Sequence, residues 1–183
     1  MSERGLAMHY VCTRGEAREL TKSITRFWVS NCGCREGRGG CHRSRLDVCL
    51  MFIEGDPFPG SGSGKKEVPH SGAEAIFQEA ESKHLVTRPF RNEARTATDG
   101  ICFCCDDCCG YFLNKDEACD KGRLIERTDM ARCTECGVCA DVCYFGARVA
   151  KQDRFEVLRD SCYGCGLCLD VCPEECIEMI SRA

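Results

Sequence analysis

The chain has 183 residues, a formal charge of −4 at pH 7 and 20 cysteines. Such a cysteine density is typical of a disulfide scaffold or a metal-binding protein. The longest uninterrupted apolar run, VCLMFI at residues 48–53, is far shorter than the roughly 20 residues that a membrane-spanning helix needs. The sequence contains no basic tract of the kind that binds nucleic acid. Composition therefore argues against nucleic-acid binding and against membrane insertion.

The N-terminal sequence MSERGLAMHY lacks the basic start and the apolar run of a secretory signal. We therefore expect a cytoplasmic protein in a reducing compartment, where disulfides are rare. Clustered cysteines in that setting more often bind metal. The length suffices for one medium domain or two small ones.

The first predicted element is a helix over GEARELTKSITRFW, because apolar residues recur there at spacings of three and four. A glycine-rich segment follows, and residues 55–72, which are rich in Gly, Pro and Ser, read as an exposed loop or linker. Ser71 and Glu74 match a capping box and predict the start of a second helix. Pro89 is expected to end that region.

The next feature is ICFCCDDCCGYF at residues 101–112, which contains two pairs of adjacent cysteines. Adjacent side chains diverge, so the pairs predict either two neighbouring sites or one larger multi-iron cluster. We expect at least one further Fe–S cluster that joins this segment to an earlier cysteine set, with a structural zinc or redox-switching thiols as alternatives. The candidate ligands are Cys32, Cys34, Cys41, Cys49, Cys102, Cys104, Cys105, Cys108 and Cys109.

Three other side chains of this region are weaker candidates. Arg35 and Arg43 could offset the charge of a cluster, although arginines beside such loops more often face solvent. His42, next to Cys41, could replace a thiolate ligand, although a surface histidine is the more common case. Cys12 and Cys119 have no partner at ligand spacing.

The C-terminal sequence contains an internal repeat, since RCTECGVCADVC and SCYGCGLCLDVC both read C-x2-C-x2-C-x3-C. Three cysteines spaced in this way can reach three corners of an iron–sulfur cubane from one curling loop, and a glycine after the second cysteine lets the backbone approach the sulfurs. The first copy supplies Cys133, Cys136, Cys139 and Cys143, and the second supplies Cys162, Cys165, Cys168 and Cys172.

On these motifs the segment resembles a bacterial-type ferredoxin with two [4Fe–4S] clusters. The resemblance implies crossed ligation, in which the fourth ligand of each cluster comes from the opposite repeat. Cluster 1 would use Cys133, Cys136, Cys139 and Cys172, and cluster 2 would use Cys162, Cys165, Cys168 and Cys143. Tyr144 stands where the family usually has proline, and Cys176 is read as a buried thiol. ARVAKQDRFEVL and CIEMI predict strands around these motifs, and each fourth cysteine is expected to begin a helical turn.

The motifs CGCRE, DVCLMF and GICFCCDDCCGYF extend the resemblance to cysteine-rich 4Fe–4S proteins of anaerobes. We therefore predict an α+β protein: residues 1–128 form a small, mostly helical and loop metal-binding domain, and residues 129–183 form a ferredoxin-like domain of βαββαβ type. The second region carries ten acidic and six basic side chains, which suits docking to a basic surface on a partner.

The predicted function is single-electron transfer to a partner redox protein or within a larger oxidoreductase complex. No catalytic residues are predicted, and we expect an electron carrier or a subunit rather than an enzyme. One alternative is a redox enzyme whose N-terminal cluster has an open, substrate-binding iron. Another is a metal or redox sensor with a zinc or dithiol site.

Overall fold

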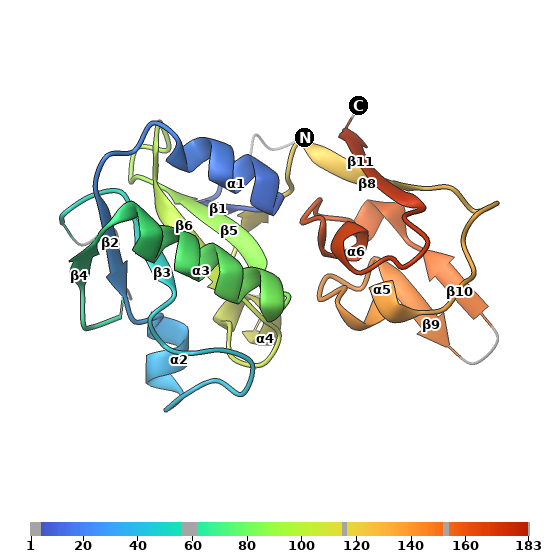
Figure 1. Ribbon diagram of the computed structural model, residues 1–183, viewed down its shortest axis with the longest axis horizontal. Coiled ribbons are helices and arrows are strands. Elements are labelled where there is room, and N and C mark those ends of the chain that lie inside the picture. The colour runs from blue at the N-terminus through green and yellow to red at the C-terminus, as the bar shows by residue number, and fades with distance from the viewer. Residues whose placement is uncertain (1–4, 56–61, 115–116, 152–153, 183) are drawn as a thin grey trace.

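The computed structural model describes residues 5–55, 62–114, 117–151 and 154–182. Figure 1 shows two parts, a larger one built from a sheet and helices of the N-terminal sequence and a smaller C-terminal one beside it. Within the described ranges, no helix combines the length and the apolar character that crossing a membrane would require.

The N-terminal part is built on a seven-stranded sheet with the strand order β4-β2-β3-β6-β5-β1-β7. Its strands are β1 (His9–Tyr10), β2 (Phe27–Ser30), β3 (Cys49–Met51), β4 (Lys66–Val68), β5 (Val86–Arg91), β6 (Thr98–Cys104) and β7 (Cys119–Asp120). Neighbouring strands are antiparallel except for β1 and β7, which are parallel.

Two helices, α1 (Arg14–Thr21) and α3 (His70–Ser82), cover one face of this sheet (Figure 1). Between α3 and the sheet lies an apolar core, in which the rings of Phe77 and Phe103 meet edge to face at 5.4 Å. The second predicted helix is present as α3, and its apolar face is buried in this core: Ala73, Ile76, Phe77 and Ala80.

The strand directions bring the N-terminal cysteines to one edge of the sheet. Because β2 and β6 are both antiparallel to β3, they run parallel to each other and their carboxyl ends share an edge. The short helices α2 (Gly33–Gly37) and α4 (Gly110–Asn114) follow β2 and β6 there, and β3 begins there with Cys49. Distant cysteine segments therefore converge at this edge.

The prediction of a mostly helical and loop N-terminal domain was wrong. Its strands are short and are buried on successive positions, as in β2 and β3, so they lack the alternation that marks a half-buried strand. The first helix ends at Thr21, and Phe27 and Trp28 instead begin β2. Pro89, expected to end the region, lies inside β5.

The capping box also differs from its prediction. Helix α3 starts after Pro69 without a side-chain cap, whereas Thr13 and Glu16 form a complete capping box at the start of α1. Of the predicted loop at residues 55–72, residues 56–61 lie outside the described ranges, and β4 and the beginning of α3 occupy part of the rest.

The C-terminal part follows the element order β8, α5, β9, β10, α6, β11. Strand β8 (Leu124–Thr128) pairs antiparallel with β11 (Ile177–Ser181), and β9 (Arg148–Lys151) pairs antiparallel with β10 (Arg154–Val157). The strands expected in this region are thus present. The predicted boundary between residues 128 and 129 falls at the end of β8.

Helices α5 (Val138–Asp141) and α6 (Leu167–Asp170) are short, and a single-turn 3-10 helix (Arg159–Ser161) precedes α6. Each α-helix carries the third cysteine of its motif, Cys139 or Cys168, and ends before the fourth. Each fourth cysteine begins a single hydrogen-bonded turn rather than a helix, since the N–H of Gly146 donates to the carbonyl of Cys143 and that of Glu175 to the carbonyl of Cys172.

Candidate functional site

The first C-terminal cavity collects cysteines from both repeats. Its lining contains three cysteines of the first motif and the last cysteine of the second, together with Phe155 and Pro173. The cysteines are Cys133, Cys136, Cys139 and Cys172. Cys176 also lines this cavity, is buried, and has its Sγ 3.5 Å from Sγ of Cys172.

The second C-terminal cavity has the complementary composition. Three cysteines of the second motif meet the last cysteine of the first, beside Phe145 and Met179. The cysteines are Cys143, Cys162, Cys165 and Cys168. The fold therefore brings the two predicted ligand sets into two separate cavities.

Two glycines shape these cavities at the starts of α5 and α6. Gly137 and Gly166 follow the second cysteine of each motif and have φ values of 82° and 81°. This left-handed conformation turns the chain from the cysteine loop into the helix, and a residue with a Cβ adopts it only at a cost. A Cβ on Gly166 would also lie 3.1 Å from Cγ2 of Thr13 in the N-terminal part.

The donor set fits an Fe–S cluster in each cavity. Four thiols are the usual ligands of a [4Fe–4S] cluster, and each thiolate binds a different iron, so the sulfurs must stand apart. Among the described residues, no three of these cysteine sulfurs lie within 4.8 Å of one another. Their spacing therefore leaves room for a cluster between them.

Arg148 lies between the two cavities and was not recognised from the sequence. Its side chain is buried, with Nη1 3.4 Å from Sγ of Cys139 and Nη2 2.6 Å from Oε2 of Glu126. Burial alone would lower the pKa of Arg148, but the charges of Cys168, Cys139 and Glu126 raise it. The guanidinium therefore stays cationic next to cysteines of both motifs.

The nine candidate cysteines of the N-terminal part separate into three groups. The first group is a compact trio, with Cys41 Sγ 3.6 Å from Cys105 Sγ and Cys105 Sγ 3.4 Å from Cys108 Sγ. The second group lies around Arg88 and consists of Cys32, Cys34, Cys104 and Cys109. The third group is Cys49 and Cys102.

Arg88 organises the second group. Its buried guanidinium places Nη1 3.3 Å from Sγ of Cys109 and 3.6 Å from Sγ of Cys104, while Nη2 donates to Glu117. Hydrogen bonds from Cys109 and Cys32 lower the pKa of the Cys34 thiol. Cys104, Cys109 and Cys34 therefore lie near one buried cation, and Cys32 joins them through its contact with Cys34.

The third group adjoins His9, whose Nε2 lies 3.8 Å from Sγ of Cys102. Burial would lower the pKa of His9, but hydrogen bonds to Cys102 and Glu117 raise it to about 9. Glu117 also accepts from Arg88, so a polar chain links the third group to the second. His9 and Arg88 are not part of any cysteine motif, so the spacing of the motifs could not identify them as neighbours of these thiols.

The weaker candidates differ in their surroundings. Arg35, expected to face solvent, is fully buried and lies beside Cys108. Arg43 is exposed, with an ion pair of 2.6 Å to Asp106. His42 is also exposed, and its backbone N–H donates to Asp107. Whether each of these side chains is buried or exposed therefore depends on how the segments pack at the sheet edge, and the local sequence does not reveal it.

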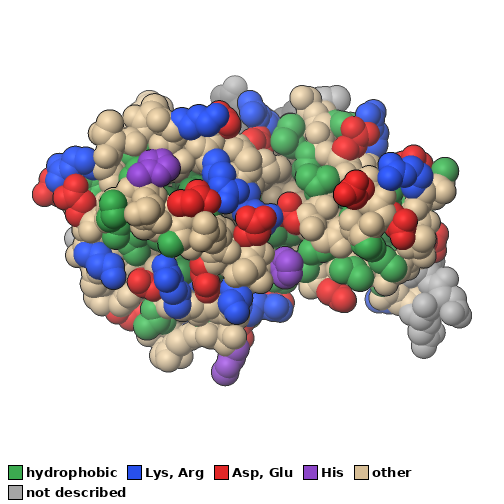
Figure 2. All heavy atoms as spheres, in the orientation of Figure 1, with side chains coloured by type: hydrophobic (Ala, Val, Ile, Leu, Met, Phe, Trp, Pro, Cys, Tyr) green, Lys and Arg blue, Asp and Glu red, His purple; other side chains and the backbone are tan. Residues whose placement is uncertain are grey.

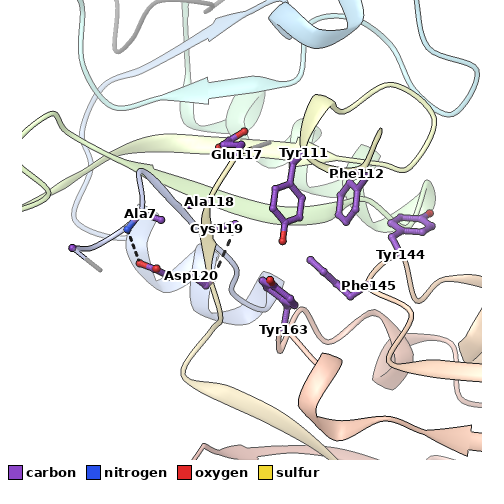
Figure 3. A pocket seen from close by; sticks show the side chains of 11 residues that line it. Ala7, Tyr111, Phe112, Glu117, Ala118, Cys119, Asp120, Tyr144, Phe145 and Tyr163 are labelled. Carbon is purple, nitrogen blue, oxygen red and sulfur yellow. Dashed lines mark hydrogen bonds between the residues drawn. The ribbon is translucent and has the colours of Figure 1, made fainter. Parts of the chain in front are cut away.

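An aromatic cluster joins the two parts of the molecule. Tyr111 and Phe112 of α4 meet three rings of the C-terminal part, Tyr144, Phe145 and Tyr163, around a cavity (Figure 3). Phe145 and Tyr163 stack with their centroids 4.3 Å apart. Because Tyr144 follows Cys143 and Gly110 links Cys109 to Tyr111, this cluster lies between the Arg88 group and the second cavity.

Residues 127–149 match the 4Fe-4S binding domain family, and residues 147–183 match the LdpA Fe-S cluster-binding domain family. No curated protein sequence matches the chain. The predicted resemblance of the C-terminal part is thereby confirmed. The chain is a cysteine-rich protein that ends in a 4Fe–4S ferredoxin-type domain.

Proposed function

We propose that the protein transfers single electrons through two [4Fe–4S] clusters, one in each C-terminal cavity. Cluster 1 would be held by Cys133, Cys136, Cys139 and Cys172, and cluster 2 by Cys162, Cys165, Cys168 and Cys143. The observation that carries this proposal is that each cavity combines three cysteines of one repeat with the last cysteine of the other. The order strand, helix, strand, strand, helix, strand also supports the ferredoxin-like arrangement.

The clusters would supply the redox chemistry, and the chain would set their environment. Arg148 donates toward the sulfur of Cys139 and brings a positive charge near both cavities. A cation and a hydrogen bond stabilise the more negative, reduced state of a cluster, so Arg148 would raise the reduction potential.

The Arg88 group would hold a further Fe–S centre in the N-terminal part. Its four thiols, Cys32, Cys34, Cys104 and Cys109, come from two segments that meet at one sheet edge. No three of these described sulfurs lie within 4.8 Å of one another, an open spacing that suits a multi-iron centre. The aromatic cluster of Figure 3 would bring this centre close to the second cavity.

The partner would be a redox protein or a larger oxidoreductase that presents a basic surface. The C-terminal region carries the net negative charge of the chain, and charge complementarity speeds the encounter of redox partners. The association should therefore weaken as the salt concentration rises.

Counting iron and acid-labile sulfide in anaerobically purified full-length protein tests the proposal. We expect roughly twelve irons or more per chain if the N-terminal centre is a cubane, and about eight from the C-terminal pair alone. EPR spectra of the reduced protein should show interacting S = 1/2 centres. A colourless, folded protein without sulfide would overturn the proposal.

A redox enzyme is the second candidate because a cavity opens beside the Arg88 group. The aromatic rings and Asp120 line it, and the side chain of Glu117, which pairs with Arg88, reaches its wall (Figure 3). Small ligands such as cyanide or carbon monoxide would shift the EPR signal of an open iron there. An unchanged signal would favour electron transfer alone.

A further inference from the structure

The cysteine trio differs from every other cysteine group in its sulfur spacing. Sγ of Cys105 lies 3.6 Å from Sγ of Cys41 and 3.4 Å from Sγ of Cys108, and all three sulfurs lie within 4.8 Å of one another. Among the described residues this is the one group of three Cys, His or acidic ligands so close together. Cys41 is intermediate in exposure, and Cys105 and Cys108 are buried.

This spacing matches ligands of a single ion. Thiolates about 2.3 Å from a tetrahedral zinc stand about 3.8 Å apart, as the tetrahedral angle requires. A cubane instead binds each thiolate to a different iron and holds the sulfurs much further apart. The trio is therefore too compact for a cubane, whereas the cysteines of both C-terminal cavities are not.

The sequence spacing agrees with a mononuclear site. Cys105 and Cys108 form a C-x2-C pair in the turn between β6 and α4, the usual spacing of two zinc ligands. Cys41 comes from the loop after α2, 64 residues away from Cys105. A bound ion would tie these two segments together at the sheet edge.

The charge balance of Arg35 requires an anionic neighbour. The guanidinium is fully buried, donates to the backbone oxygens of Arg45 and Phe103, and leaves Nε without a hydrogen-bond partner. Within the described residues, none of its hydrogen bonds reaches a carboxylate, yet it lies beside Cys108. Burying an unpaired charge is costly, so a ligand site beside Arg35 should carry a net negative charge.

A divalent ion accounts for both observations. Three bare thiolates so close together would repel one another unless a cation lies between them. One divalent ion with three thiolates has a net charge of −1, which the guanidinium neutralises. A water molecule as the fourth ligand leaves this charge balance unchanged.

We propose that Cys41, Cys105 and Cys108 bind one tetrahedral Zn²⁺ ion, with water as the fourth ligand. The site is separate from the Fe–S centres and goes beyond the proposed electron transfer. The two sites also account for the adjacent cysteines in this segment. Cys105 and Cys108, the inner two, would bind this ion, whereas Cys104 and Cys109, the outer two, belong to the Arg88 group.

Metal analysis of the full-length protein, expressed with zinc and purified anaerobically, tests this site. We expect one zinc per chain in addition to the iron. Cys108→Ser should lose that zinc while the iron and sulfide contents stay unchanged. The control Cys12→Ser, outside all proposed ligand sets, should keep both. Loss of iron in Cys108→Ser without any zinc in the parent protein would overturn the proposal.

X-ray absorption at the zinc edge of the unmodified protein keeps the test independent of variant folding. Three sulfur neighbours at about 2.3 Å and one oxygen neighbour are expected. Four sulfur neighbours, or absence of zinc from protein expressed with zinc, would contradict the assignment. Neither result depends on whether the C-terminal clusters transfer electrons.

Discussion

The guanidinium of Arg148 donates to Glu126 over 2.6 Å, and both side chains are almost completely buried. The same guanidinium faces Cys139 through its other terminal nitrogen, at 3.4 Å from Sγ. The ion pair with Glu126 therefore holds the guanidinium of Arg148 next to the sulfur of Cys139, a predicted cluster ligand. In the N-terminal part, the buried Arg88 likewise contacts a carboxylate and a thiol, those of Glu117 and Cys109, although the side chain of Glu117 is exposed.

Replacing Arg148 should destabilise the protein because the buried carboxylate of Glu126 would lose its closest cationic partner. We expect Arg148→Met to lower the free energy of unfolding by about 3–5 kcal/mol in anaerobic denaturant titrations. The double variant Glu126→Gln/Arg148→Met should recover part of that loss. Arg159 approaches the same carboxylate at 3.5 Å but is half exposed, so Arg159→Met should cost less than about 1 kcal/mol. Equal effects of the two arginines would contradict this account.

Cys172 and Cys176 test the predicted ligand set within one cavity. Their sulfurs are 3.5 Å apart, so the two positions have nearly the same surroundings. Cys172→Ser should lose about four irons, as expected for loss of one cubane. Cys176→Ser should keep all the iron, as measured by colorimetric iron and sulfide analysis. The reverse pattern would make Cys176 the ligand.

Removing iron should unfold the C-terminal part selectively. Helices α5 and α6 have four residues each, far too short to be stable alone, and crossed ligation would make cluster binding part of the folding energy. After iron removal by an anaerobic chelator, amide hydrogen exchange should become rapid over residues 129–182. The seven-stranded sheet should stay protected. Persistent protection around α5 and α6 would show that the fold does not depend on clusters.

Gly166→Ala tests the left-handed turn that leads into α6. The φ of 81° alone should cost about 1–2 kcal/mol, and the added Cβ would press on Thr13 at 3.1 Å. Gly15→Ala in α1 is the control, because the added Cβ would lie at an ordinary contact distance of 3.9 Å from Oγ1 of Thr13. That control should be neutral or stabilising by up to about 1 kcal/mol in thermal unfolding. Similar destabilisation by both variants would argue against backbone strain.

Local spacing was enough to identify the C-terminal domain from the sequence. Each C-x2-C-x2-C-x3-C motif places its cysteines within one loop and turn, so their chemistry can be read without the tertiary fold. The matches to two Fe–S domain families confirm that reading. The strands around the motifs were likewise visible as short apolar segments with a polar turn.

Only the tertiary structure decided how the N-terminal cysteines divide. Cys34, Cys41 and Cys49 meet cysteines that follow them by more than fifty residues, because β2, β3 and β6 share one sheet edge. The sheet itself escaped prediction since strands buried on both faces show no alternation. Burial of Arg35 and Arg148 depends on the same long-range packing. The sequence by itself predicted Fe–S binding by the local C-terminal motifs, and the strand pairing decided which N-terminal thiols stand together.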